Sequence, residues 1–562
     1  MNGKIRKLLA DRHLALSQHQ HNKVISIKPK LQCEIRRAKL MYAAKVEQSL
    51  KFDNSRQSWD QLKSILSLKK PNSQCHLLLD VLNKCYTRFE KYISPPNISQ
   101  VIQDDLSPVT VCWRPWNLST SVKVPADNIP NKLLKTAAHS LSELLRDLFN
   151  NCISQGVFPV VWKSSTIIPI PKNAGTNEAK EFCPIALTST LSKLFERMLL
   201  KFLQPYLADT TQLAYQQHRS TEDALAHLLD IVTNHLDINA KDHGRCIFIG
   251  LSNEFNTISP TTLCNQLQDT SLNLAVLNRI YDFMTNHPQK VLTRPIICTY
   301  HICRNTTRFC NQPFLFSIYV QHMPKPSSGN FHLIKYADDT VFIELLSKND
   351  VSQMDIAAHD LAGWCHDNDL FLNVSKTKEL LLCNLRDNPV HNSLIIDGNN
   401  VEQVDSFKYL GTVIDKRLRF QEHSMEVIKK ARKRLYITKK LYAMRVSGPL
   451  RVQCYTTFIE CIFLYHLSTV FGHPSAMSRK SINRVIDLAG FLGGCDFDTI
   501  ETVYERVMKT RCLRLVVTGQ TNPVFVFDQL PSGRYKSVKA RVNIWSDCFL
   551  SLCVRKLNSR LF

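Results

Sequence analysis

Between about residues 105 and 420, apolar and polar positions follow two alternating patterns. Segment 131–153 repeats apolar residues at helical spacing, whereas the short apolar runs at 165–172 and 245–251 are typical of strands. The patterns alternate and show no tandem repeat. They predict an α+β fold with an antiparallel sheet.

One pair of strand-like runs encloses two adjacent acidic residues. The runs HLIKY (332–336) and TVFIELL (340–346) are separated only by Ala337, Asp338 and Asp339. So short a connection predicts a β-hairpin, with both carboxylates at its tip.

The two ends of the chain have a different pattern. Residues 1–70 are rich in Lys and Arg and read as helices, and segments rich in Pro and Asn follow them as a linker. The first 70 residues are either a solvated helical arm or a nucleic-acid contact. After Phe420 a basic helix is predicted, with an apolar stripe that includes Met425, Ile428, Leu435 and Tyr442.

The composition indicates which kind of molecule the protein binds. The formal net charge is +23, which favours a polyanion, and nucleic acid before a membrane surface. No apolar window is long enough and free enough of charge for a membrane span, and the N-terminus has no apolar signal core. The 19 cysteines form no pair or cluster at zinc spacing. We therefore expect an intracellular protein, nuclear or cytoplasmic, with no zinc and no membrane.

The carboxylate pair has two interpretations. Adjacent carboxylates repel each other, and two Mg²⁺ ions that neutralise them would suit phosphoryl transfer, in which two metals clamp the attacking and leaving oxygens. The other interpretation is a solvated acidic turn, which explains most isolated Asp-Asp pairs. The pair alone does not decide between them.

Eight motifs in order give a more specific indication. YADD within an apolar hairpin resembles the signature of reverse transcriptases, and its flanking segments resemble those of non-LTR (LINE-type) retrotransposon enzymes. The matching segments are STIIPIPK (165–172), FCPIALTSTLSKLFERML (182–199), LAYQQHRSTEDAL (213–225), FIGLSNEFNTI (248–258), PFLFSIY (313–319), LFLNVSKTKEL (370–380), FKYLGTVID (407–415) and LPSGRYKSVKARVN (530–543).

The resemblance implies a right-hand polymerase fold and an RNA-directed DNA polymerase that uses an RNA template, a DNA primer and two Mg²⁺ ions. Its protein partners are unknown. The chain begins in what resembles the linker after the endonuclease, and nothing in it resembles that nuclease. The expected division is a basic helical arm and linker (1–95), fingers and palm with an antiparallel sheet (96–420), a helical basic thumb (421–500) and a C-terminal segment (501–562).

The resemblance also assigns roles to individual residues. Asp338 and Asp339 would be catalytic and bind metal, and Lys376 would lie near the leaving pyrophosphate. Lys172 and Phe255 would bind the nucleotide, Phe255 by crowding the ribose 2′-OH. Nucleic-acid contacts are expected from Arg219, Tyr409, Gly411, Lys429, Lys430, Arg432 and Lys433. The alternative interpretation is that each lysine is a solvated charge and that Phe255 is a core residue.

One departure from the family pattern concerns the catalytic centre. The residue aligned with the first catalytic Asp is Gly250, so the strand expected beside the YADD hairpin brings no carboxylate. A two-metal site needs ligands from both strands. Glu254 would lie past the strand end and is a poor substitute. We expect weakened Mg²⁺ binding.

Other positions depart from the pattern as well. Cys183 and Gln216 replace two arginines, Thr307 replaces a template-contacting Gln, and Arg308 replaces a glycine whose backbone freedom Arg cannot match. Together these losses should cost far more than the ~1.4 kcal/mol that corresponds to one decade of rate. We expect little or no polymerase activity, as in a partly degenerate copy.

Three classes of function therefore stay open. The first is a reverse transcriptase domain whose catalytic site is defective, and the sequence favours this class. The second is a non-catalytic protein that binds RNA or RNA–DNA hybrid. The third is a polymerase that works despite Gly250.

Overall fold

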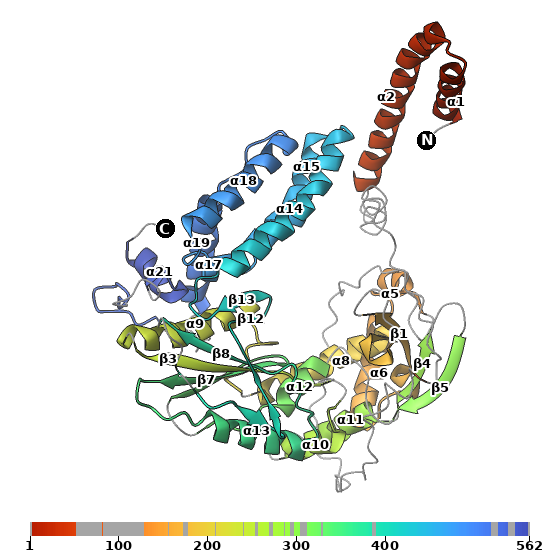
Figure 1. The fold of residues 1–562 in the computed structure, drawn as a ribbon. Coiled ribbons are helices and arrows are strands. Elements are labelled where there is room, and N and C mark those ends of the chain that lie inside the picture. The colour runs from red at the N-terminus through yellow and green to blue at the C-terminus, as the bar shows by residue number, and fades with distance from the viewer. Residues whose placement is uncertain are drawn as a thin grey trace. The chain divides into compact units, whose positions relative to one another are not determined.

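The chain divides into two compact units in a computed structural model. One unit is Pro71–Leu410, and the other combines Met1–Lys70 with Gly411–Phe562; each is described by itself below (Figure 1). The described residues are 3–51, 81, 129–155, 157–171, 178–207, 209–239, 241–252, 257–268, 274–285, 287–292, 297–303, 312–326, 330–384, 389, 391–518, 527–537 and 546–559. The predicted linker lies largely outside them.

The unit Pro71–Leu410 contains a four-stranded sheet with the order β2-β1-β4-β5. Strand β1 pairs antiparallel with β2 and parallel with β4. The strands are β1 (Ser165–Pro171), β2 (Phe182–Thr188), β4 (His287–Leu292) and β5 (Ile297–Cys303).

A five-stranded sheet with the order β11-β8-β3-β7-β6 is the second sheet of this unit. The pairs between β8, β3, β7 and β6 are antiparallel, as the sequence predicted, whereas β11 pairs parallel with β8. The antiparallel prediction is thus wrong for β11 and for β4 beside β1. The strands are β3 (His243–Ile249), β6 (Phe331–Tyr336), β7 (Asp339–Leu346), β8 (Lys378–Cys383) and β11 (Glu402–Val404).

Helices cover both faces of the second sheet (Figure 1). Gly244 of β3 faces Val232 on α9 (Thr221–Ile238), whereas Ile247 shares a core with Leu361 on α13 (Met354–Asp367). Every residue of β3 is therefore buried. An uninterrupted apolar run such as CIFI is typical of a strand covered on both sides.

Further helices of this unit surround the same core. Phe149, Phe158, Trp162 and Phe195 form an aromatic cluster within it, and the Phe149 and Phe195 ring centroids lie 5.2 Å apart. The helices are α5 (Asn131–Thr136), α6 (Ser142–Gln155), α7 (Val160–Lys163), α8 (Thr190–Leu203), α10 (Pro260–Gln268), α11 (Leu274–Met284) and α12 (Gln312–Tyr319). Short elements complete the unit: η1 (Ala179–Glu181), η2 (Gln204–Tyr206), β9 (Ile395–Ile396), β10 (Asn399–Asn400) and β12 (Ser406–Tyr409).

The other unit is predominantly helical, as the basic terminal segments predicted. Its elements are α1 (Gly3–Ser17), α2 (His21–Lys51), β13 (Thr412–Asp415), α14 (Gln421–Ala443), α15 (Gly448–Tyr455), η4 (Thr456–Glu460), α16 (Cys461–Leu464), α17 (Leu467–Val470), α18 (Ala476–Gly493), α19 (Ile500–Thr518) and α21 (Phe549–Asn558).

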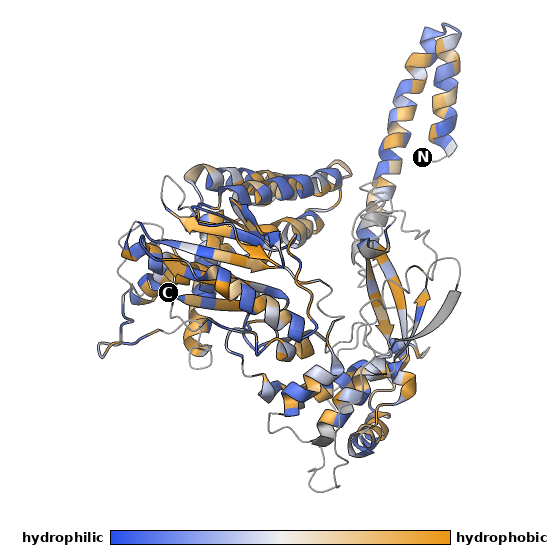
Figure 2. Ribbon diagram, turned by 60° about the horizontal axis from the view of Figure 1, so that its bottom comes forward, coloured by the Kyte–Doolittle hydropathy of each residue, from blue (hydrophilic) through white to orange (hydrophobic). Residues whose placement is uncertain are grey.

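Helix α14 buries a narrower stripe than the sequence suggested. Ile428, Leu435 and Leu441 are buried, but Met425 is 56% exposed and Tyr442 is 43% exposed. The prediction is right for Ile428 and Leu435 and wrong for the two ends of the stripe. Polar and apolar residues also alternate along α1 and α2 (Figure 2). Among the described residues, no helix has the length and apolarity that crossing a bilayer requires.

Candidate active site

The two acidic residues lie at a hairpin tip, as the sequence predicted. Strands β6 and β7 pair so that Tyr336 is opposite Asp339, which leaves Ala337 and Asp338 as a two-residue turn. Asp339 is the first residue of β7 and is exposed, whereas Asp338 is partly buried. The turn is thus one residue shorter than expected, because Asp339 already joins the ladder.

Strand β3 brings position 250 beside this hairpin. In its pairing with β7, Ile249 is opposite Thr340, so one further step in the same register places Gly250 opposite Asp339. Residues directly opposite each other in an antiparallel pair point to the same face. Position 250 is therefore where a side chain could meet the carboxylates, and it carries none.

The backbone around Gly250 is tightly held. Its N–H donates to Thr377 Oγ1 at 3.1 Å, and its carbonyl accepts from the Asn373 N–H at 2.8 Å. A Cβ at position 250 would lie 2.4 Å from the Lys376 Cβ and 3.0 Å from the Lys376 carbonyl carbon. The turn at 373–377 has closed over the space that a side chain at position 250 needs.

Lys376 lies at the same strand end. It is exposed, and its Nζ donates to the Leu251 carbonyl at 3.2 Å. Leu251 itself forms an isolated bridge with Leu372. The lysine that the resemblance placed near the leaving pyrophosphate is thus close in space to Gly250.

Two tyrosines lie within electrostatic range of the carboxylates. Burial and the charge of Asp338 raise the pKa of Tyr215 to about 12, and burial and the charge of Asp339 raise the pKa of Tyr409. The Tyr409 side chain is 2% exposed and packs against Phe248, with centroids 5.4 Å apart. A ring so buried is a core residue in this structure, which is not what we expected of a nucleic-acid contact.

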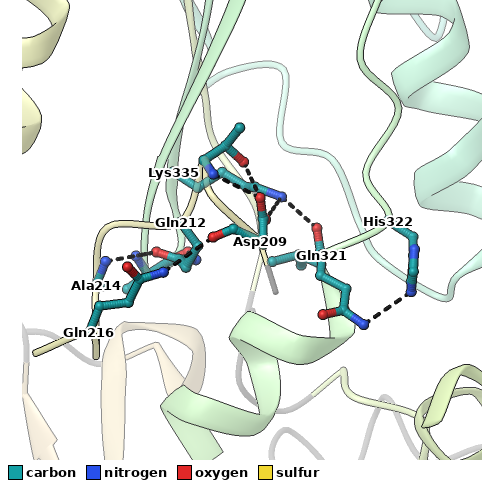
Figure 3. A network of polar contacts seen from close by, with 10 residues as sticks. Asp209, Gln212, Ala214, Gln216, Gln321, His322 and Lys335 are labelled. Carbon is teal, nitrogen blue, oxygen red and sulfur yellow. Dashed lines mark hydrogen bonds and ion pairs between the residues drawn. The ribbon is translucent and has the colours of Figure 1, made fainter. Parts of the chain in front are cut away.

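The backbone of the turn is clamped by a side chain that the sequence analysis did not single out. Gln212 Nε2 donates to the Ala337 carbonyl at 3.3 Å, and the Ala337 N–H donates to Gln212 Oε1 at 2.9 Å. Figure 3 shows Gln212 within a larger polar network with Asp209, Gln216 and Lys335. A glutamine 125 residues away from its partner gives no local signal of this contact.

Cys183 and Gln216, which stand where the family pattern has arginines, have uncharged side chains. Cys183 is partly buried on β2, and Gln216 Nε2 donates to the Asp209 carbonyl at 3.2 Å. Arg219 keeps its charge but is half-buried just before α9, which begins with a capping box formed by Ser220 and Asp223. Burial lowers the Arg219 pKa, and its Nη1 has no hydrogen-bond partner among the described residues.

Several expected site residues fall outside the described residues. They are Lys172, Phe255, Glu254, Thr307 and Arg308.

The remaining expected contacts belong to the helical unit. Gly411 has φ +89°, which favours glycine, and a Cβ there would lie 3.1 Å from the Tyr465 ring. Lys429, Lys430, Arg432 and Lys433 are all exposed on α14, and Lys430 pairs with Glu426 at 3.0 Å.

The donor set near the hairpin does not fit a pair of magnesium ions. Two Mg²⁺ ions need carboxylates from both strands, and among the described residues only Asp338 and Asp339 supply carboxylates at the junction of β3 and β7. Within the described ranges, no group of three or more His, Cys, Asp or Glu residues is placed to hold a metal ion.

The family model and the known proteins that match this chain all describe the same kind of enzyme. Residues 170–414 match the family model described as reverse transcriptase (RNA-dependent DNA polymerase). The chain is 24% identical to a probable RNA-directed DNA polymerase from transposon BS of Drosophila melanogaster, over 64% of this chain and 41% of that protein. It is 21% identical to the RNA-directed DNA polymerase from mobile element jockey of Drosophila funebris, over 65% of this chain and 41% of that protein. The chain thus spans about two fifths of these relatives.

Solved structures of telomerase are also similar. Telomerase of Candida tropicalis matches with a TM-score of 0.33 and 10% identity, covering 68% of this chain and 72% of that chain. Telomerase of Candida albicans matches with a TM-score of 0.32 and 12% identity, covering 67% and 76%. At these scores the likeness carries no argument about the arrangement of subdomains.

Proposed function

Residues 170–414 of this chain are a reverse transcriptase domain of the non-LTR, LINE-type class, and from this premise we propose that the chain descends from an RNA-directed DNA polymerase but has lost its catalysis. Because the chain spans only 41% of its curated relatives, every activity of a whole element is a proposal here. The proposal concerns the catalytic centre between β3 and β7.

One observation carries the proposal. The residue that follows β3 beside the acidic hairpin is Gly250, and the turn at Lys376 occupies the space of a Cβ at that position. Position 250 therefore supplies no carboxylate, and Lys376 occupies the space that such a side chain would need. We propose that the site lacks both a negative charge for the metal ions and the room for a side chain that could supply it.

Metal chemistry explains why this loss matters. In two-metal phosphoryl transfer, a carboxylate pair from two strands positions both ions about 3.5–4 Å apart. Asp338 and Asp339 would hold at most part of that pair, and we propose that Mg²⁺ binding is weak. Asp338, Asp339 and Lys376 are accordingly the residues of an ancestral catalytic role.

The arrangement of subdomains is part of the same proposal. Residues 96–420 would supply fingers and palm, 421–500 a thumb, 1–95 a basic arm with its linker, and 501–562 a C-terminal segment. The helical, exposed and basic character of α14 supports the assignment of a thumb.

A second candidate function is non-catalytic binding of RNA or of an RNA–DNA hybrid. The exposed cations of α14 support it, since lysines and arginines contact phosphates irrespective of sequence. Arg219 supports it too, because its buried Nη1 has no hydrogen-bond partner among the described residues. The ancestral ligands, an RNA template and a DNA primer, would be the natural ones, at an intracellular site in the nucleus or cytoplasm.

Primer extension on a primed RNA template tests the proposal. The parent chain is compared with Asp338→Asn, which serves as the blank, in Mg²⁺ and separately in Mn²⁺. We expect equal signals from the two proteins. Template binding measured on the same samples separates a folded, silent protein from an unfolded one.

The variant series also includes an attempted repair. Gly250→Asp alone should stay silent, because its Cβ meets the Lys376 Cβ. Extension by the parent above the Asp338→Asn blank would overturn the proposal and favour a polymerase that tolerates Gly250.

A further inference from the structure

A short segment before α9 lies alongside the hairpin strand β6. The Leu213 N–H donates to the Lys335 carbonyl, and the Lys335 N–H donates to the Thr211 carbonyl, both at 2.8 Å. Gln212 and Lys335 thus form an isolated parallel bridge. Segment 209–214 extends the five-stranded sheet at the edge that leads into the acidic turn.

The turn that follows β6 has an unusual backbone. Ala337 is 8% exposed and has φ +58°, in the left-handed region that residues with a Cβ seldom adopt. Such a conformation persists only where surrounding contacts impose it. Since Asp338 comes next, the conformation of Ala337 sets the direction in which the Asp338 carboxylate points.

A two-residue hairpin turn itself favours positive φ at its first position, and one side chain adds contacts that hold Ala337 there. Gln212 is fully buried and binds both backbone polar groups of Ala337, the carbonyl through Nε2 and the N–H through Oε1. Its Oε1 also accepts from the Ala214 N–H at 3.1 Å. The amide therefore satisfies three backbone groups, two of which belong to the turn.

A buried ion pair anchors the segment that carries Gln212. Lys335 Nζ lies 2.5 Å from Asp209 Oδ2 with both side chains almost fully buried, and it also donates to the Val320 carbonyl at 2.7 Å. Asp209 Oδ1 accepts from the Thr211 N–H at 2.9 Å. Figure 3 shows Asp209 and Lys335 pointing toward each other beside Gln212.

We infer that Gln212 is a positioning residue for the acidic turn, holding Ala337 in its left-handed conformation and so fixing the direction of Asp338. Contacts within the protein thus hold the turn. The buried Gln212 amide binds its backbone, and the Asp209–Lys335 ion pair anchors the segment that carries Gln212. This inference is independent of whether the polymerase is active.

Hydrogen–deuterium exchange of the full chain tests the clamp. In Gln212→Leu the Ala337 N–H loses its partner, and exchange in peptides spanning the turn should rise about 10-fold or more, the usual effect of an unsatisfied buried group. Peptides within β7 beyond Phe342 should stay protected. Gln216→Leu, which loses a bond of the same network but not one to the turn, should leave turn exchange unchanged.

A double-variant cycle separates positioning from simple packing. Glycine adopts positive φ without penalty, so Ala337→Gly should raise the thermal midpoint of the parent more than that of the Gln212→Leu chain, in which Ala337 is free to relax. Gln212→Met, which has nearly the same length and shape but neither donor nor acceptor of the amide, provides a second variant if Gln212→Leu does not fold. Unchanged exchange at the turn, or an equal effect of Ala337→Gly in both backgrounds, would overturn the inference.

Discussion

A side chain at position 250 would overlap the turn that precedes β8. A Cβ there would clash with the Lys376 Cβ and would lie 3.0 Å from the Lys376 carbonyl carbon. The turn at 373–377 therefore occupies the space that a side chain at position 250 would need. Restoring the carboxylate has to reopen that turn.

This crowding gives a prediction for stability. Gly250→Ala should lower the free energy of unfolding by about 1–3 kcal/mol, as overpacking usually does, and Lys376→Gly in the same chain should recover part of the loss. Urea unfolding measures both. Gly363→Ala is the matched control, because a Cβ at Gly363 has open space within α13. A Gly250→Ala chain as stable as the parent would contradict the crowding.

A second prediction concerns a partly buried carboxylate on α9, that of Asp230. Burial raises the pKa of Asp230 to about 7, and its buried Oδ1 has no hydrogen-bond partner among the described residues. A carboxyl whose folded pKa is raised holds its proton longer in the folded state. Its contribution to stability is therefore full below the unfolded pKa near 4 and is lost as the pH rises to about 7.

Asp230→Asn should remove that loss. Relative to the parent, the variant should gain about 1–3 kcal/mol in free energy of unfolding between pH 4 and pH 7, and nothing further above that range. Chemical unfolding at several pH values measures the difference. His227, whose pKa burial lowers to about 4, is common to both proteins and cancels. A difference that does not change with pH would exclude the raised pKa.

At the residue scale, sequence and structure agree where the signal is local. Asp338 and Asp339 could be placed at a hairpin tip because apolar runs flank them directly. The Gln212 clamp could not be foreseen, because its partner is 125 residues away and glutamine has no spacing rule of its own. The burial of Tyr409 could not be foreseen either, because its ring packs against Phe248, which is distant in the sequence.

At the scale of elements, periodicity predicts which segments form strands and helices, but it gives little information about which strands pair with each other. The runs at 165–172 and 245–251 are indeed β1 and β3. That β1 pairs parallel with β4 could not be read from either strand, because parallel partners are joined by long connections. On α14 the apolar stripe was extended to Met425 and Tyr442, although both lie off the buried face, which runs along the helix from His423 to Leu441.

The pairing of segment 209–214 with β6 gives an element-scale prediction. Lys335→Met leaves the Asp209 carboxylate buried without a counter-charge, and should lower the free energy of unfolding by about 3–5 kcal/mol. Replacing both members, Lys335→Met with Asp209→Leu, should cost much less. Thermal unfolding of the three proteins checks the order. A single variant no less stable than the double variant would show that the ion pair does not anchor this segment.

For the whole molecule, the net charge of +23 dominates the behaviour expected with nucleic acid. Affinity for single-stranded RNA should fall linearly on a log–log plot against salt, with a slope of about −0.7 per phosphate contact. Lys429→Gln with Lys433→Gln removes two such contacts and should flatten this slope by about 1.4 units. Arg506→Gln with Lys509→Gln, two exposed cations of α19, is the charge-matched control. Binding that is unaffected by salt would count against the nucleic-acid proposal.

The central claim is that this reverse transcriptase domain no longer polymerises because position 250 carries no carboxylate. The most direct measurement is the amount of DNA that the purified chain synthesises on a primed RNA template in Mg²⁺ or Mn²⁺. The account predicts the same background signal from the parent and from Asp338→Asn, with template binding retained in both. Synthesis by the parent that Asp338→Asn abolishes would contradict it.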